Sequence, residues 1–255
     1  MGPGDLLAAF QLCGLQKGDV LFLHSDAFFL AQFPGKDIAD KSDFFFSFLE
    51  DFLGFEGTLV LPVFTYSFTK NETFDVENSP SSVGILTEIF RKRKGVVRSK
   101  DPIFSVSAIG KHAEEFKNAS AIDSFGPESS FALLYGLNAK IACLGCSFSR
   151  ITFTHFAEQK LGVKYRYPKI FKGLIIDNGI TSVAEVSYFV RDTSFGTAAD
   201  LTLLKSRLTE RNKLKNSSIG RASLISVAVE DFIDEAALLL SVNPFGLIEA
   251  GQEDQ

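Results

Sequence analysis

The sequence has no tryptophan and only one methionine, three histidines and three cysteines among 255 residues. Its aromatic residues are mostly phenylalanine, 27 residues against five tyrosines. A phenylalanine ring buries a large apolar area and offers no polar group to a ligand, so we expect most of these rings to lie in the core. With 45% hydrophobic residues, a chain of this length suits one large domain over residues 1–255.

The chain also lacks an excess of basic residues, because its formal net charge is -5. Binding to nucleic acid or to an anionic membrane needs a concentrated basic face, so the composition argues against both kinds of partner. No charged leader precedes a long apolar run, and about eighteen uninterrupted apolar residues occur nowhere. We expect a cytoplasmic protein without a membrane span.

The few cysteines do not describe a disulfide framework, since Cys13, Cys143 and Cys146 are an odd number in a chain without an export signal. Cys143 and Cys146 form a C-x-x-C in an apolar run with no second cysteine or histidine pair nearby. We interpret them as small buried hydrophobes and predict no metal site; a metal or redox role is the alternative. The chain also lacks the G-x-x-x-x-G-K-S/T, G-x-G-x-x-G and G-x-S-x-G motifs.

Apolar runs typical of strands alternate with helical patterns along the first part of the chain. Asp5 can cap a first helix and Ser42 a second one. Such an alternation builds sheets with parallel strands. The predicted strands are 19–24, 58–64, 104–110 and 139–145, and the predicted helices are 6–13, 43–53, 79–94, 125–136 and 151–162.

Residues 171–190 predict a β-hairpin, because Asn178 and Gly179 suit a tight turn between two β-rich runs. Helical patterns at 199–212 and 230–240 flank a further strand at 221–229. The predicted fold class is α/β: a three-layer α/β/α sandwich with a mixed, largely parallel central sheet and an antiparallel β-hairpin excursion at about 170–191.

The stretch "TFTHFAEQ", residues 152–159, places His155 and Glu158 one turn apart on a predicted helix, so both side chains project from the same face. This helix follows a buried strand, where open α/β folds usually place their ligands. A carboxylate beside an imidazole raises its basicity, as a general base for an amine requires. The alternative is a solvated polar face with an incidental histidine.

Two further stretches could hold an anionic cofactor. His24 ends the first strand and Ser25 and Asp26 follow it, and N–H groups and a hydroxyl there can hold a phosphate or a carbonyl oxygen; a capped strand end is the alternative. The basic cluster 91–100 is a second candidate, with Arg98 and Ser99 best placed to point inward. A solvated helix end is the alternative for this cluster.

The segment "YRYPK", residues 165–169, follows the helix that carries His155. Its two tyrosines, with Arg166 between them and Lys169 beside them, could bind a planar or sugar ring with a negative group attached. Packing of the tyrosines against the domain is the alternative.

Together these blocks resemble the aminoglycoside 3-N-acetyltransferase family, acetyl-CoA-dependent N-acetyltransferases whose fold differs from that of the GNAT superfamily. The resemblance runs over nearly the whole chain. It rests on "LQKGDVLFLHSD", "GTLVLPVFTYSF", "SPSSVGILTEIFRKRKGVVRSKDPIFSVSAIGK", "FGPESS" and "TFTHFAEQ".

The resemblance implies amide formation between an acetyl thioester and an amine, with His155 as the general base and Glu158 as its partner. Direct transfer needs no covalent intermediate, so a route through Cys143 or Cys146 is the weaker mechanism. From the resemblance and the residues together, the predicted cofactor residues are His24, Ser25, Asp26, Ser81, Ser82, Arg98 and Ser99, and the predicted substrate residues are Thr65, Tyr66, Tyr165 and Arg166.

Asp26 and Asp101 depart from the pattern of many resistance enzymes in the family, which have Ser and His there. In this respect the chain is more similar to relatives associated with surface polysaccharides, and Arg166 and Lys169 favour an anionic acceptor. We therefore predict an amino-sugar acceptor, nucleotide-linked or acidic, from a bacterial surface glycan pathway. The alternatives are an aminoglycoside antibiotic as acceptor and a protein that binds CoA or glycan precursors without turnover. The sequence leaves open whether the protein forms a homodimer.

Overall fold

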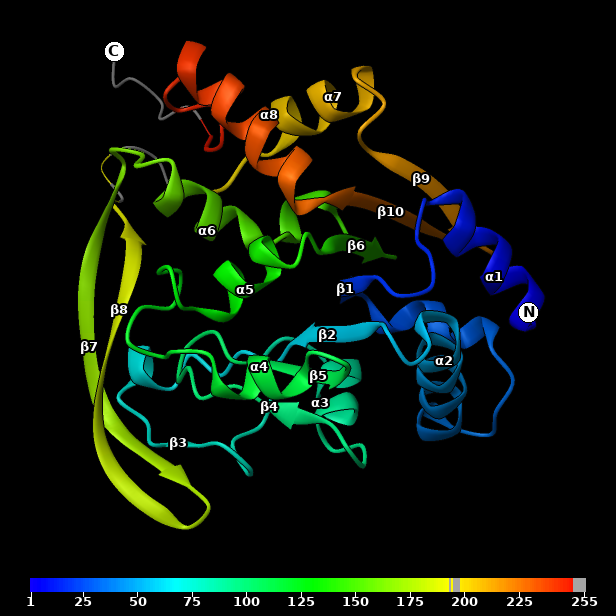
Figure 1. Ribbon diagram of the computed structural model, residues 1–255, viewed down its shortest axis with the longest axis horizontal. Helices are drawn as coiled ribbons and strands as arrows, with labels where there is room; N and C mark the ends of the chain where they lie inside the picture. Colours follow the sequence, from blue (N-terminus) through cyan, green and yellow to red (C-terminus); the bar gives the residue numbers. More distant parts are fainter. Residues whose placement is uncertain (193, 195–197, 250–255) are drawn as a thin grey trace.

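A computed structural model describes residues 1–192, 194 and 198–249, and its centre is a seven-stranded sheet (Figure 1). The strands of this sheet are β1 (Val20–Ser25), β2 (Thr58–Pro62), β4 (Val97–Arg98), β5 (Val106–Gly110), β6 (Lys140–Leu144), β9 (Lys215–Ile219) and β10 (Ala222–Ala228). Their order is β4-β5-β2-β1-β6-β10-β9. β1 pairs in parallel with β2 and β6, whereas β5 and β10 run against their neighbours. The predicted mixed, largely parallel sheet is confirmed.

Helices cover both faces of this sheet, because alternate side chains of a strand point to opposite faces. In β1, Phe22 enters a core that includes α5, α6, α7 and α8, while Leu21 and Leu23 enter a second core formed with α1, α2 and α3 (Figure 1). The predicted α/β/α arrangement is therefore confirmed. The helices are α1 (Pro3–Leu12), α2 (Ile38–Leu53), α3 (Ile85–Arg91), α4 (Ala113–Asn118), α5 (Ser130–Gly136), α6 (Phe153–Lys160), α7 (Thr202–Glu210) and α8 (Val229–Val242), with short 3-10 helices η1 (Ala27–Gln32), η2 (Phe68–Lys70) and η3 (Phe148–Arg150).

The first two helices begin earlier than the sequence predicts. Gly2 precedes α1, and Asp5 lies inside the helix, where its Oδ2 accepts a hydrogen bond from Gly2 N at 2.9 Å. Asp37 caps α2 by accepting from the N–H of Asp40, while Ser42 donates to Ile38 O within the helix. In both helices the predicted cap residue lies within the first turns, and its side chain forms a hydrogen bond with the backbone from there.

The long hairpin is formed by β7 (Arg166–Asp177) and β8 (Ile180–Arg191), and β3 (Phe74–Asp75) adds to it as a parallel edge strand. Asn178 and Gly179 have φ angles of 49° and 76°, as the predicted tight turn requires. The hairpin is confirmed, although it begins at Arg166 rather than near residue 170. Its first residue therefore lies only a few positions beyond α6.

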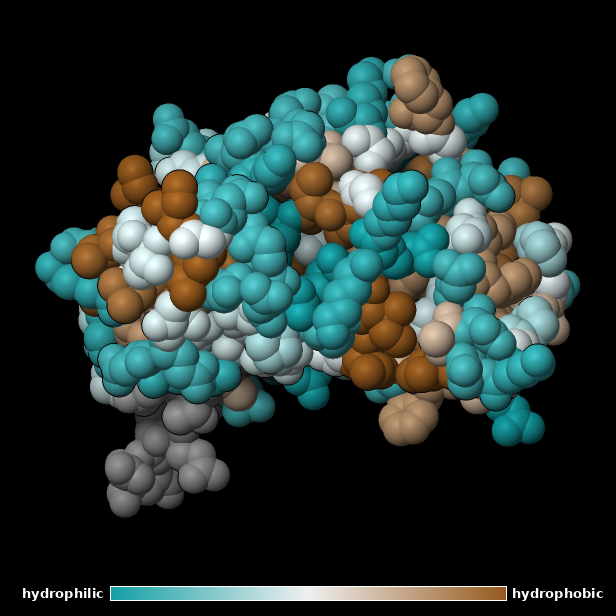
Figure 2. Space-filling model, turned by 90° about the horizontal axis from the view of Figure 1, so that it is seen from below, coloured by the Kyte–Doolittle hydropathy of each residue, from teal (hydrophilic) through white to brown (hydrophobic). Residues whose placement is uncertain are grey.

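The outer face of the hairpin carries exposed apolar side chains, including Ile170, Leu174 and Val183. Figure 2 shows apolar residues gathered at the side of the molecule where the hairpin lies. In the described part of the chain, no helix combines the length and hydropathy that a membrane crossing needs.

Candidate active site

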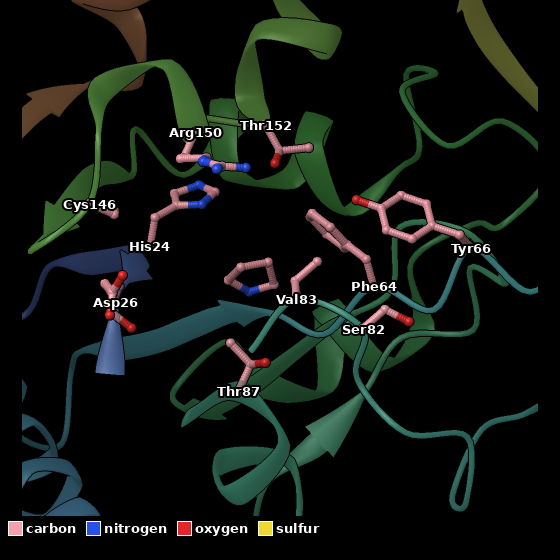
Figure 3. A pocket seen from close by; sticks show the side chains of 12 residues that line it. His24, Asp26, Phe64, Tyr66, Ser82, Val83, Thr87, Cys146, Arg150 and Thr152 are labelled. Atoms are coloured by element: carbon pink, nitrogen blue, oxygen red, sulfur yellow. The ribbon is translucent and has the colours of Figure 1, made fainter. Parts of the chain in front are cut away.

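A cleft of about 540 Å³ opens where the parallel strands β1, β2 and β6 end (Figure 3). Ligands of open α/β folds bind outside the carboxyl ends of such strands. Each of the three strands continues into a segment that contributes to the wall, and the loop before α3 closes another side. The lining residues are His24, Ser25, Asp26, Pro62, Phe64, Tyr66, Ser82, Val83, Thr87, Cys146, Arg150 and Thr152.

His24 brings an uncharged imidazole to this cleft. Its ring packs edge-on against Phe22, with 4.6 Å between the ring centroids. Burial lowers the pKa of His24 to about 4, so the ring is neutral at neutral pH. Among the described residues, neither Nε2 of His24 nor the hydroxyl of Ser25 has a hydrogen-bond partner, although both are buried. These two polar atoms are therefore available to a ligand.

Arg150, Thr152 and Cys146 line the cleft, and none of the three was among the predicted site residues (Figure 3). These residues follow β6, just as His24 and Ser25 lie at the end of β1. Their position after an apolar, strand-like run was the signal in the sequence that could have identified them. Arg150 is exposed and supplies a cation to the wall. Cys146 is only partly buried, so the prediction of two buried hydrophobes holds for Cys143 and is wrong for Cys146.

His155, Glu158 and Arg166 form a compact cluster beside the cleft. Nδ1 of His155 lies 3.1 Å from Oε2 of Glu158, as their spacing on α6 allows. Arg166, the first residue of β7, places Nε 2.7 Å from the same Oε2 and Nη2 2.9 Å from Nδ1 of His155. The side chain of Glu158 is fully buried, and that of Arg166 is 1% exposed.

The cluster holds a buried carboxylate in its charged form. Burial raises the pKa of Glu158, but the hydrogen bond with His155 and the charges of His155 and Arg166 outweigh it, and the pKa lies below its ordinary value. For His155, burial lowers the pKa, the hydrogen bond with Glu158 raises it, and the charge of Arg166 lowers it again. The net pKa of His155 is below its ordinary value, so its imidazole is neutral at neutral pH.

His155 adjoins one end of the cleft across an aromatic wall. Thr152, which precedes α6, and Tyr66 both line the cleft. The ring of Phe104 lies 5.6 Å from that of Tyr66 and 6.1 Å from that of His155. Tyr66 also has a φ of 57°, a costly conformation for a bulky residue that is common at functional sites. The cleft and the cluster are therefore neighbours.

The segments that form the cleft and the cluster of His155, Glu158 and Arg166 lie within a match to a protein family. The model of the aminoglycoside 3-N-acetyltransferase family matches residues 22–241, from β1 to the end of α8. The chain belongs to this family. The suspected resemblance is confirmed, and the family is described as one of acyltransferases, as the resemblance implied.

Individual relatives agree with this membership. The SPbeta prophage-derived aminoglycoside N(3')-acetyltransferase-like protein YokD of Bacillus subtilis (strain 168) is 26% identical over 171 residues, which are 58% of this chain and 61% of that protein. The chain thus spans less than two thirds of this curated relative.

Solved structures of the family share the fold. The apoenzyme of aminoglycoside acetyltransferase AAC(3)-IVa has a TM-score of 0.79 at 23% identity and covers 98% of this chain and 92% of its own. A structure described as AAC-IIIb binary with CoASH has a TM-score of 0.78 at 20% identity and covers 95% of this chain and 97% of its own.

Several residues predicted from the family motifs lie in the cleft or beside it. His24, Ser25, Asp26, Tyr66 and Ser82 line it. The hydroxyl of Ser81 lies 2.7 Å from that of the lining residue Thr87. Their binding roles stay predictions.

Arg98 and Ser99, predicted to contact the cofactor, are committed to the protein backbone instead. The guanidinium of Arg98 donates to the carbonyl oxygens of Val63, Val76 and Ser79, and the side chain is buried. The hydroxyl of Ser99 accepts from Val106 N and is buried as well. The polar side-chain atoms of these two residues are therefore used within the fold, and cofactor contacts at them stay a prediction.

The predicted substrate residues Thr65 and Tyr165 are also buried. Thr65 donates its hydroxyl to Pro102 O at 2.8 Å and is 4% exposed, and Tyr165 is fully buried. Arg166 is held in the cluster with Glu158 and cannot offer its charge to an acceptor. Of the segment 165–169, Lys169 remains exposed on β7.

Proposed function

We propose that the protein transfers an acetyl group from acetyl-CoA to an amine of an aminoglycoside-type amino sugar. The observation that carries this proposal is the cluster of His155, Glu158 and Arg166 beside a cleft at the ends of parallel strands. The family membership supports the same reaction, and a solved relative described as a binary complex with CoASH supports the cofactor.

His155 would act as the general base. An alkyl ammonium is not a nucleophile, so it first loses one proton to solvent, and a second proton passes to His155 as the nitrogen attacks the thioester carbon. Nε2 keeps a lone pair for that proton in the tautomer whose Nδ1 donates to Glu158, and this tautomer requires Nη2 of Arg166, a donor 2.9 Å from Nδ1, to turn its hydrogen away. The C–N bond forms, the C–S bond breaks with its electron pair on sulfur, and the proton held by His155 neutralises the departing thiolate.

The cleft fits the acyl donor. A thioester oxygen that gains negative charge needs donors already in place, and His24 and Ser25 present buried polar atoms without protein partners among the described residues. Arg150 supplies positive charge for a phosphate, and Ser82 and Thr152 add hydroxyl groups. When bound there, acetyl-CoA would supply the activated acetyl group.

The choice of acceptor depends on the charges of the residues near His155. The case for an anionic sugar rested on Arg166 and Lys169 beside the tyrosines. Arg166 is buried and paired with Glu158, and Tyr165 is buried, whereas Lys169 is exposed on β7. A carboxylate lies on the same side as His155 instead: Gln159, one turn along α6, donates to Oδ2 of Asp123 at 2.7 Å. Carboxylates attract a polycationic amino sugar, so an aminoglycoside suits the site better than a nucleotide-linked or acidic sugar of a surface glycan.

Release of free thiol from acetyl-CoA tests the proposal. We expect release with aminoglycosides and little with nucleotide-linked amino sugars or amino sugar acids. His155→Ala should lower kcat by about 10²-fold to 10⁴-fold, the usual contribution of a general base. His112→Ala is the matched control, because His112 pairs with Glu115 at the surface. Release with none of these acceptors would instead favour a binding protein, and turnover only with anionic sugars would restore the surface-glycan substrate.

A further inference from the structure

Tyr66 brings a phenol into the cleft, and its hydroxyl is not used by the fold. The residue lies in the segment after β2, and Figure 3 shows its hydroxyl directed into the cavity from the wall opposite His24. Within the described residues, this hydroxyl takes part in no hydrogen bond. We propose that it donates a hydrogen bond to the sulfur of a bound thioester and stabilises the negative charge that collects there as the C–S bond breaks.

The backbone at Tyr66 has a conformation that bulky residues rarely adopt, with a φ of 57°. Its N–H donates to Ile103 O at 3.3 Å, and its carbonyl oxygen accepts from the N–H and the hydroxyl of Thr69 at 3.1 and 2.8 Å. The preceding residue, Thr65, turns its hydroxyl to Pro102 O instead. Such costly conformations cluster at functional sites, and here the strained residue is the one that reaches the cleft.

The phenol ring is held by aromatic neighbours at the end of the cleft nearest His155. Its centroid lies 6.1 Å from that of Phe64 and 5.6 Å from that of Phe104, and both of these rings are buried. Phe104 in turn lies 6.1 Å from the ring of His155. A donor that is already fixed near the base needs little reorganisation when charge develops.

The surroundings keep the hydroxyl of Tyr66 protonated. Burial raises its pKa above the ordinary value of 10.0, and the neighbouring phenol of Tyr188 raises it further. A thiol has an ordinary pKa of about 8.5, so a thiolate is a weaker base than the phenolate of Tyr66. The hydrogen therefore stays on Tyr66, which acts as a hydrogen-bond donor, and the proton held by His155 completes the thiol.

With Tyr66 in this role, the cleft offers a donor to each atom that gains charge. The thioester oxygen gains it when the amine attacks, and His24 and Ser25 present their unpartnered polar atoms from the end of β1. The sulfur gains it when the C–S bond breaks, and Tyr66 faces the cavity from the opposite wall (Figure 3). Tyr66 would thus act in the second half of the transfer.

The role of Tyr66 rests on the proposed function but can be measured without an acceptor. CoA labelled with ¹³C at the carbon beside its sulfur reports by NMR the pKa of the bound thiol. In Tyr66→Phe this pKa should be higher than in the wild type by about one unit or more, the size of a hydrogen bond to a charged group. The change keeps the ring and removes an oxygen without a partner among the described residues, so the variant should fold.

A matched control removes a different phenolic hydroxyl. Tyr135, on α5, lies outside the cleft lining, and its ring contacts Phe156 and Lys160. Tyr135→Phe keeps that ring and should leave the pKa of the bound CoA thiol at the wild-type value. In acetyl transfer, Tyr66→Phe should lower kcat about 10-fold to 100-fold with little change in the KM for the acceptor, whereas Tyr135→Phe should change neither.

The outcomes separate the role of Tyr66 from the proposed function. An unchanged pKa of the bound CoA thiol in Tyr66→Phe would overturn the contact with sulfur, whatever the change in kcat. A raised KM for the acceptor with that pKa unchanged would make Tyr66 an acceptor ligand instead. A shifted pKa of the thiol without acetyl transfer to any acceptor would uphold the contact and sink the proposed function.

Discussion

Arg98 and Arg166 are both buried guanidinium groups, and the chain uses them in different ways. Arg98 donates to backbone carbonyls and stacks on Phe74, 5.0 Å from the ring centroid, so its role is to satisfy acceptors inside the fold. Arg166 meets two ionisable side chains, so its charge acts on their protonation. A sequence shows two basic residues and does not distinguish these roles, because the difference lies in contacts with distant segments.

Arg98→Met should destabilise the protein and leave cofactor binding intact. The change removes the donor from the carbonyl oxygens of Val76 and Ser79, while Val63 O keeps the hydroxyl of Ser105, and we expect a cost of about 1 to 3 kcal/mol in the free energy of unfolding. Urea unfolding measures this loss, and the KM for acetyl-CoA should stay near the wild-type value. A raised KM with unchanged stability would instead make Arg98 a cofactor ligand.

At the level of elements, local patterns predicted more than contacts between elements. The apolar runs predicted β1, β2, β5 and β6, and the Asn178–Gly179 turn predicted the hairpin. Residues 215–219, "KNSSI", form the edge strand β9 although they lack an apolar run, because pairing with β10 holds them. The spacing of His155 and Glu158 predicted a shared helix face, and the resemblance to the family implied their roles. The contact with Arg166 depends on how β7 leaves α6, which no local pattern encodes.

The hairpin approaches the body of the protein closely at Gly173. A Cβ placed there would lie 2.6 Å from the buried ring of Phe68, on η2. Gly173→Ala should therefore cost about 1 to 3 kcal/mol of stability, the usual penalty of overpacking. Gly136→Ala, at the end of α5, meets nothing within 4 Å and should not destabilise the protein. Equal melting temperatures for both variants would show that β7 is not held against η2.

At the scale of the whole molecule, the cleft exists because parallel strands end together. Its lining comes from segments near residues 25, 64, 85 and 150, which are far apart in the sequence. Sheet order could not be read from the chain, so the residues after β6 were missed even though β6 itself was predicted. The same topology buries His24, which sits on the central strand between β2 and β6. His24, a residue of the cleft, therefore affects the stability of the fold as well as the proposed chemistry.

Burial of His24 should make the protein less stable in mild acid. The folded state holds its pKa near 4, against an ordinary value of 6.5, so the unfolded chain binds the extra proton first as the pH falls below 6.5. Between pH 7 and pH 5 this linkage removes about 2 kcal/mol from the free energy of unfolding. His24→Gln cannot take up that proton, so its urea midpoints at the two pH values should differ less than those of the wild type. An equal loss in both proteins would mean that His24 is charged in the folded state or that other groups carry the acid sensitivity.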